Sequence, residues 1–185
     1  MKKLFIVHRW EGSPTSDWYQ WLAREVSGSF DVNILEMPNP NEPVIEEWVS
    51  FINKNVKNLS ENVYLIGHSI GCQAILRFLE HSSFKVGKVF FVAPWLTLTP
   101  AATDGVERIA SPWLETPINW ESIKCKASEF TCLFSDNDPY VAYENRKVFK
   151  QNLSAQIISV GNKGHITEED DITELSELAD LIKIS

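Results

Sequence analysis

Apolar residues along the chain gather in six short runs, separated by segments rich in polar residues, glycine and proline. The runs occupy Leu4–Val7, Val32–Leu35, Val63–Ile66, Val86–Val92, Phe130–Phe134 and Gln156–Val160. Short apolar runs bounded by turn-forming residues are typical of buried strands. Because most of the runs are nearly continuous in Val, Ile, Leu and Phe, they predict strands covered on both faces, as in a parallel sheet.

Between most of these runs, apolar residues recur at the three- and four-residue spacing of a helix. The spacing is clearest over 18–26, 44–56 and 72–79, and later candidates cover 141–153 and 172–184. Strands that alternate with helices predict a parallel sheet with helices on both faces and right-handed crossovers. A chain of 185 residues is long enough for one such core. We therefore expect a single α/β domain over residues 1–185, with three α/β/α layers around a mainly parallel, six-stranded sheet.

The stretch from Pro94 to Lys126 departs from this alternation. It contains four prolines and three tryptophans and shows no clear strand. It follows the fourth predicted strand, and open α/β sheets bind ligands beyond the carboxyl ends of their strands. Long connections in compact domains are more often functional than idle. We expect a cap-like insertion over about 94–126 that borders the site; the alternative is a long surface loop anchored by its aromatic residues.

One motif points to the chemistry. Gly67-His68-Ser69-Ile70-Gly71 follows the third predicted strand and precedes a helical pattern. A nucleophile elbow has this form, because its sharp turn leaves no room for Cβ atoms two residues before and after the nucleophile. The serine then sits at a helix N-terminus, where partial positive charge stabilises a developing anion. We predict Ser69 as the nucleophile; the alternative is a glycine-rich turn with an incidental serine.

A serine nucleophile needs a base and a third group that orients the base, in the chain order Ser, Asp or Glu, His on an α/β-hydrolase sheet. Three of the four histidines lie before Ser69, beside it or in the helix behind it. The fourth, His165, follows the last predicted strand and is the predicted general base. The alternative is a surface histidine that caps the acidic turn at 168–171. We expect His8 to secure a strand end rather than to act in catalysis.

The orienting acid is expected after the fifth predicted strand, where Asp136 and Asp138 are the candidates. Asp138 is the better one, because Pro139 fixes the backbone directly after it and is expected to start the next helix. Asp136 is more suited to shaping the turn. The Asp-x-Asp spacing also resembles a calcium loop, but position six would be Val141 instead of glycine and position twelve Lys147 instead of glutamate.

An oxyanion hole requires two backbone donors. The first is expected to be the N–H of Ile70, and the second is expected from the loop after the first strand, with Trp10 preferred over Arg9. We also predict that the substrate pocket is lined by four side chains, Arg9, Trp95, Trp113 and Trp120. Tryptophans are core residues by default, so the alternative is that these rings only pack.

The net charge and the lengths of the apolar runs exclude several classes of binding partner. A net charge of −8 argues against nucleic acid and anionic membranes as main partners. The apolar stretch near the N-terminus is too short for a signal peptide, and no run has transmembrane length. Cys72, Cys125 and Cys132 lack metal-type spacing and indicate reduced, buried thiols. We expect a cytoplasmic protein that needs no cofactor or metal, does not insert into a membrane and acts on a small-molecule acyl substrate.

These residues resemble those of an α/β-hydrolase and, more narrowly, of the small serine hydrolases related to retinoblastoma-binding protein nine. The resembling segments are Gly12–Pro14, Asp17–Tyr19, Met37–Pro40, Gly67–Cys72, Asn119–Lys124, Asp138–Pro139 and Gly164–His165. The resemblance implies a compact α/β-hydrolase fold, a Ser-Asp-His triad and hydrolysis of esters or related acyl compounds. Two departures matter. Arg9 stands where many relatives have glycine, and the retinoblastoma-pocket motif Leu-x-Cys-x-Glu is absent, so that partner is not implied.

The sequence therefore favours a serine esterase acting through Ser69, Asp138 and His165. One alternative is a non-catalytic binding module on the same fold, which Arg9 at the oxyanion loop favours. A second alternative is cleavage of a thioester or amide by the same three residues. A nucleotide-binding protein fits the topology but lacks both the G-x-G-x-x-G fingerprint and a P-loop.

Overall fold

The computed structural model of the chain describes residues 1–102 and 107–184. Its centre is a six-stranded sheet in the order β2-β1-β3-β4-β5-β6, and every neighbouring pair is parallel. The strands are β1 (Lys2–Val7), β2 (Phe30–Leu35), β3 (Val63–His68), β4 (Val86–Val92), β5 (Ala127–Phe134) and β6 (Gln156–Ser159). The six predicted strands and the parallel sheet are confirmed. All six residues of β3 are buried, which accounts for its unbroken apolar run.

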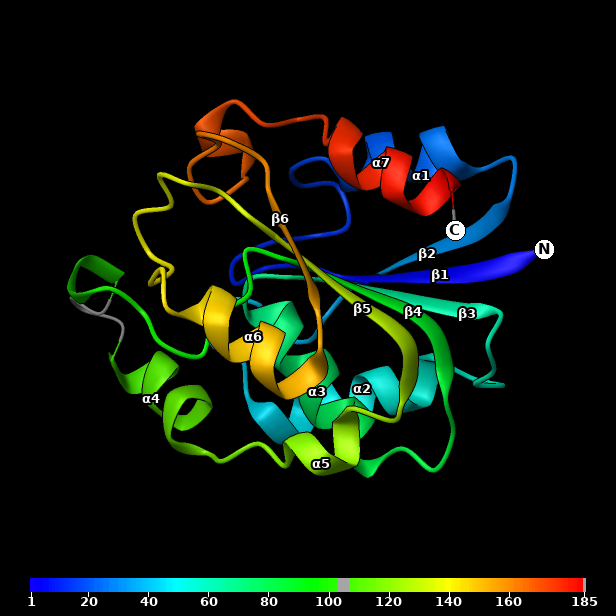
Figure 1. Cartoon of the computed structure of the whole chain (residues 1–185), viewed down its shortest axis with the longest axis horizontal. Helices are drawn as coiled ribbons and strands as arrows, with labels where there is room; N and C mark the ends of the chain where they lie inside the picture. The colour runs from blue at the N-terminus through cyan, green and yellow to red at the C-terminus, as the bar shows by residue number, and fades with distance from the viewer. Residues whose placement is uncertain (103–106, 185) are drawn as a thin grey trace.

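Helices cover both faces of the sheet (Figure 1). One face carries α1 (Tyr19–Val26) and α7 (Ser176–Lys183), which contact each other. The other carries α2 (Ile45–Asn55), α3 (Ile70–His81), α5 (Trp120–Ile123) and α6 (Asn145–Leu153), which contact one another in series. The core includes Trp18 and Tyr19 of the first layer and Trp48 of the second, all fully buried. The expected three-layer α/β/α architecture is therefore confirmed.

The strand order fixes where a ligand site belongs. β1 lies between β2 and β3, so the chain turns to opposite sides of β1 as it adds these two strands. Such a switch point opens a crevice beyond the carboxyl ends of the strands on either side of it. The loop after β1 begins at His8, and the elbow serine follows β3. The two segments are thus brought together by topology alone.

The stretch over 94–126 contains η1 (Pro100–Ala102), α4 (Glu107–Glu115) and α5, and residues 103–106 of it lie outside the described residues. Its two halves differ in position. In Figure 1, α4 lies at the end of the molecule where the strands finish, whereas α5 joins the helical layer under the sheet. Leu98 forms an isolated antiparallel bridge with Val141. The expectation of a cap over the whole stretch stays a prediction for its first half, since α5 packs on α3 and α6.

The cysteine prediction needs one correction. Cys72 and Cys132 are buried, and burial raises the pKa of both thiols. Cys125 is exposed, because it lies in the turn between α5 and β5 with Lys124 and Lys126 on either side. Of the helices in the described parts of the chain, none combines the length and the apolar character that a membrane span requires.

Candidate active site

Ser69 lies at a strained turn between β3 and α3. Its backbone has φ 54° and ψ −120°, a left-handed φ that non-glycine residues seldom adopt. A Cβ atom at Gly67 would lie 2.7 Å from the Cα and N atoms of Cys72. A Cβ atom at Gly71 would overlap the carbonyl oxygen of Val7 and approach that of His8 to 2.7 Å. The two glycines therefore allow the close approach of backbone that a nucleophile elbow requires.

The structure brings Ser69, His165 and Asp138 into one chain of hydrogen bonds. Ser69 Oγ lies 2.8 Å from His165 Nε2, and His165 Nδ1 lies 2.8 Å from Asp138 Oδ2. With the ring neutral, Nδ1–H donates to the carboxylate and Nε2 accepts from the serine hydroxyl. All three side chains are largely buried, so little water competes for these bonds. This is the arrangement in which a histidine takes a proton from a serine.

The two candidate acids have distinct environments. Asp138 has a side chain that is 4% exposed, and its Oδ1 accepts the N–H groups of Tyr140 and Val141 at 2.9 and 3.1 Å. These bonds fix the carboxylate and leave Oδ2 for His165. Asp136 has a side chain that is 49% exposed and accepts from Arg146 and Ser159 instead. Asp136 therefore shapes the turn, in agreement with the role expected for it.

One carboxylate holds three groups of the loop that carries His165. Asp170 Oδ2 accepts the N–H of His165 at 2.8 Å and both the N–H and the hydroxyl of Thr167. Gly164 has φ 53°, and a Cβ atom there would overlap the Asp170 side chain. The alternative role for His165 was to cap the acidic turn. The turn binds the backbone N–H of His165, while the imidazole ring of His165 faces Ser69.

The loop after β1 decides between the two candidates for the second oxyanion donor. The N–H of Arg9 donates to Tyr19 Oη at 3.2 Å, so it is already engaged. No hydrogen bond within the described part of the chain occupies the N–H of Trp10. Ile70 is the first residue of α3, and its N–H has no acceptor within the helix. The geometry therefore favours the Trp10 and Ile70 N–H groups as the pair.

Arg9 does not project freely into the site. Its Nε donates to Asp17 Oδ2 at 2.9 Å, and Nη2 donates to Asp17 Oδ1 at 3.3 Å and to Glu169 at 2.8 Å. The Asp17 carboxylate also accepts the N–H of Glu168 at 2.9 Å. Arg9 therefore ties the loop after β1 to the segment after β6, which contains η2 (Glu168–Asp170).

A second buried network, which the sequence did not reveal, supports the same two loops. Tyr19 Oη donates to His68 Nδ1 at 2.7 Å, and His68 Nε2 donates to the carbonyl of His165 at 3.1 Å. Burial lowers the pKa of His68 to about 4, although the charge of Asp17 opposes the shift. His8 donates from Nδ1 to the Arg9 carbonyl and accepts the N–H of Met37, which is the structural role expected for it. Burial also lowers its pKa.

The buried histidines predict how stability depends on pH. Because the unfolded His68 binds a proton near pH 6.5 and the folded one only near pH 4, the free energy of unfolding should fall as the pH drops through this window. The shift corresponds to about 3 kcal/mol. Asp17 and Glu169, whose pKa values are lowered from 3.8 and 4.5, begin to lose their contributions only as the pH falls to these ordinary values and below. Urea unfolding at several pH values tests this.

The matched comparison uses His68→Gln and His81→Gln, since His81 is exposed at the end of α3. The slope of stability against pH between 6.5 and 4 should shrink in the first variant and persist in the second. A slope that is the same in both variants would contradict the assignment to His68.

A cavity of about 500 Å³ opens beside Ser69. Its lining residues are Arg9, Trp10, Glu11, Ser69, Ile70, Trp95, Leu98, Ala102, Ile109, Ala110, Tyr140, His165, Thr167, Glu169 and Asp170. Trp95 donates from Nε1 to Ser69 Oγ at 3.3 Å, and the ring of Tyr140 packs edge-on against that of His165. Arg9 and Trp95 therefore lie where the sequence placed them, at the wall of a pocket.

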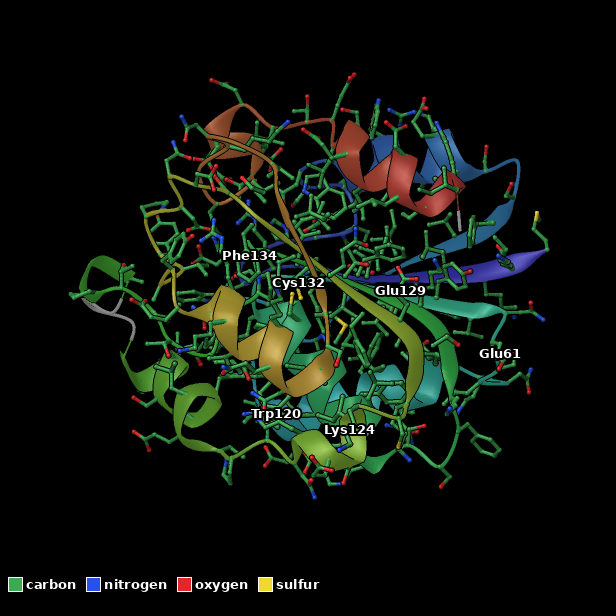
Figure 2. The ribbon with its side chains drawn as sticks, in the orientation of Figure 1. Glu61, Trp120, Lys124, Glu129, Cys132 and Phe134 are labelled. Atoms are coloured by element: carbon green, nitrogen blue, oxygen red, sulfur yellow. The ribbon has the colours of Figure 1, made fainter. Side chains whose placement is uncertain are left out.

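Trp113 and Trp120 require a correction, because neither lines this cavity. Trp113 is 1% exposed and donates from Nε1 to the Pro43 carbonyl. Trp120 packs edge-on against Phe149 of α6, and Figure 2 shows it in the helical layer under the sheet. Trp113 is a core residue, and Trp120 is half-buried and packs against the core, so the alternative that these rings only pack applies to both. Among the described residues there is also no group of three or more His, Cys, Asp or Glu side chains placed to hold a metal ion.

Comparison with known proteins agrees with this geometry. The model of the serine hydrolase family matches residues 4–183, almost the whole chain. The chain belongs to the serine hydrolase family. This serine hydrolase is 28% identical to the ydeN gene product of Bacillus subtilis over 184 residues, which span 98% of this chain and 94% of the relative. It is 26% identical to the serine hydrolase RBBP9 of Rattus norvegicus, over 91% and 86% of the two chains.

The similarity to the B. subtilis protein extends to its three-dimensional structure. The crystal structure of the B. subtilis ydeN gene product superposes on this serine hydrolase with a TM-score of 0.90, over 99% of this chain and 97% of the other. The resemblance inferred from the motifs is thereby confirmed. The protein is an enzyme, a serine hydrolase with an α/β-hydrolase fold.

Proposed function

We propose that this enzyme cleaves small esters or related acyl compounds through an acyl-enzyme intermediate, with Ser69, His165 and Asp138 as its catalytic triad. The observation that carries the proposal is the 2.8 Å contact between Ser69 Oγ and His165 Nε2 at the wall of a partly apolar cavity. A serine, its base and an orienting acid within hydrogen-bond distance are what nucleophilic catalysis requires.

Acylation begins when Ser69 Oγ attacks the acyl carbonyl and its proton passes to His165 Nε2. Asp138 accepts from Nδ1–H and stabilises the imidazolium that forms. The carbonyl oxygen becomes an oxyanion, which the N–H groups of Ile70 and Trp10 stabilise. The N-terminus of α3 adds partial positive charge at the same place. The tetrahedral intermediate collapses as His165 returns the proton to the leaving oxygen.

Deacylation repeats these steps with water as the nucleophile. His165 takes a proton from water, the hydroxide attacks the acyl carbon, and Ser69 leaves with the proton that His165 returns. Trp95 donates to Ser69 Oγ in the free enzyme and so helps to fix the hydroxyl toward the cavity. The same steps cleave a thioester or an amide, so matched butyryl ester, thioester and amide substrates decide among these three classes.

The proposal is tested by labelling the folded enzyme with a fluorophosphonate probe, which reacts only with an activated serine. We expect one adduct per chain, mapped to Ser69 by peptide mass spectrometry. An adduct on another serine would refute the assignment. No adduct at all would favour the alternative that the fold has kept a binding role without catalysis.

The two neighbouring aspartates give a matched pair for the role of the acid. Asp138→Asn should lower kcat by about 10³- to 10⁴-fold. The amide oxygen would still accept the N–H groups of Tyr140 and Val141, so the amide nitrogen would donate to His165 Nδ1 and hold the ring in the tautomer whose Nε2 cannot take the serine proton. Asp136→Asn changes the same chemistry two residues away and should leave kcat within about threefold, since this side chain only braces the turn. Equal losses in the two variants would contradict the assignment of Asp138.

A further inference from the structure

The cavity beside Ser69 has two unlike sides. One side is apolar and comes from the segment after β4; its residues are Trp95, Leu98, Ala102, Ile109 and Ala110. The other side is charged and comes from the loop after β1 and the segment after β6; its residues are Arg9, Glu11, Thr167, Glu169 and Asp170. In Figure 1, α4 and the segment after β6 lie on opposite sides of the end where the strands finish. A bound substrate would therefore contact apolar side chains at one end and charged side chains at the other.

Arg9 is the one lysine or arginine among the residues that line the cavity, and its charge is already paired with carboxylates of the protein. Four of its five N–H groups donate within the protein: one from Nε and one from Nη2 to Asp17, one from Nη2 to Glu169, and one from Nη1 to the Trp10 carbonyl. An arginine that binds a substrate carboxylate or phosphate needs a free pair of donors for a bidentate contact. Arg9 lacks such a pair.

The remaining charge on this side is negative. The cavity is lined by three carboxylates, Glu11, Glu169 and Asp170, against the single guanidinium, and Asp17 lies directly behind Arg9. A charged group on the substrate thus meets a local excess of negative charge. Glu11 and Glu169 are exposed, so water and salt weaken the effect of this excess, which is strongest at low ionic strength.

The direction of proton transfer places the leaving group on the charged side. His165 returns its proton to the leaving oxygen, so that oxygen must lie next to His165 Nε2. Residues that follow His165 in the chain form part of the charged side, and the Asp170 carboxylate accepts the His165 N–H at 2.8 Å. The acyl chain is then left to the apolar side, beside Trp95 and α4.

We propose that this enzyme takes esters with an uncharged, apolar acyl group and a neutral or cationic alcohol, and that it discriminates against anionic leaving groups such as phosphorylated or sulfonated alcohols and thiols. The inference rests on the proposed function, because it takes Ser69 and His165 as the reacting pair. It names the substrate class that the site selects.

A matched series of butyrate esters tests the selectivity. The alcohols are choline, 3,3-dimethylbutanol and 3-hydroxypropanesulfonate, which share a similar length and differ in charge. Butyrate release gives kcat/KM for each, and competition against fluorophosphonate labelling of Ser69 gives the relative binding of each. We expect the anionic ester to fall at least about tenfold below the neutral one at low ionic strength, and the gap to narrow in salt. The cationic ester should equal or exceed the neutral one.

Two variants that change the net charge equally separate the effect of a carboxylate in the cavity from the effect of the protein's overall charge. Glu169→Gln removes the carboxylate that pairs with Arg9 and should raise kcat/KM for the anionic ester about fivefold relative to the neutral one. Glu174→Gln changes the net charge equally at an exposed position that is not part of the cavity lining and should leave this ratio unchanged.

Each outcome bears on one proposal. Equal turnover or equal competition by the three esters would overturn the selectivity, as would equal effects of the two variants. If no ester is turned over while Ser69 still reacts with the fluorophosphonate, the competition data decide the selectivity alone. Failure of the fluorophosphonate to label Ser69 would instead overturn the proposed function.

Discussion

Replacing Ser69 by alanine should abolish ester turnover, with kcat reduced by at least about 10⁴-fold. The loss is expected to be this large because the serine oxygen would form the bond to the acyl carbon, and Ser69 is the hydroxyl that hydrogen-bonds to His165 Nε2 among the described residues. Residual rate would come only from water activated by His165 and from the oxyanion donors. Initial rates with p-nitrophenyl butyrate, measured over a wide range of enzyme concentration, provide the test.

This variant is expected to remain folded. The side chain of Ser69 accepts one hydrogen bond from Trp95 and pairs with His165, and alanine tolerates the φ of 54° no worse than serine does. Thermal unfolding should therefore shift by only a few degrees. Ser50→Ala, at an exposed position on α2, controls for nonspecific effects of losing a hydroxyl. Turnover that survives in Ser69→Ala and not in a denatured sample would mean that another nucleophile carries the reaction.

Replacing Gly71 by alanine should have the largest effect on stability, a loss of about 3 kcal/mol or more. The added methyl group would overlap the main-chain oxygen of Val7, the last residue of β1, and would come within 2.7 Å of that of His8, and these backbone atoms cannot turn away as a side chain could. Relief would require β1 and α3 to separate, and β1 is hydrogen-bonded on both sides. Urea unfolding monitored by tryptophan fluorescence measures the change.

Gly28→Ala provides the control, since a Cβ atom at Gly28 meets no heavy atom within 4 Å. Its stability should stay within about 0.5 kcal/mol of the parent, or rise slightly through loss of unfolded-state entropy. If both variants were equally stable, the elbow would be less tightly packed than the distances indicate. Any activity loss in a fully folded Gly71→Ala would then point to displacement of the Ile70 N–H.

Periodicity alone was sufficient to predict most of the fold. Strands such as β3 and β4 are buried on both faces. Because a strand buried on both faces needs apolar side chains at successive positions, each appears in the sequence as a nearly unbroken apolar run. Helix α3 was recognisable for the related reason that its apolar face covers the sheet. The candidate triad could be chosen by chain order, since a fixed topology brings the ends of β3, β5 and β6 to one edge.

The features that the sequence did not reveal depend on contacts between distant segments. Arg9 meets Glu169 across 160 positions, and Tyr19 meets His68 across 49, and neither pairing leaves a local pattern. The same dependence on distant contacts explains why the sequence placed Trp113 and Trp120 in the substrate pocket. Trp113 and Trp120 carry the same ring as Trp95, and only the path of the chain decides which ring faces Ser69 and which faces the core.

The separation of Ser69 from its base has a consequence for the growing polypeptide on the ribosome. Ser69 and its elbow are synthesised 96 residues before His165, and Arg9 is synthesised 160 residues before its partner Glu169. A nascent or prematurely terminated chain that ends before β6 therefore exposes a serine with no base beside it and an oxyanion loop with nothing to fasten it. In the proposed mechanism Ser69 becomes reactive only after His165 has been synthesised and has folded beside it, so shorter products carry the nucleophile in an unreactive form.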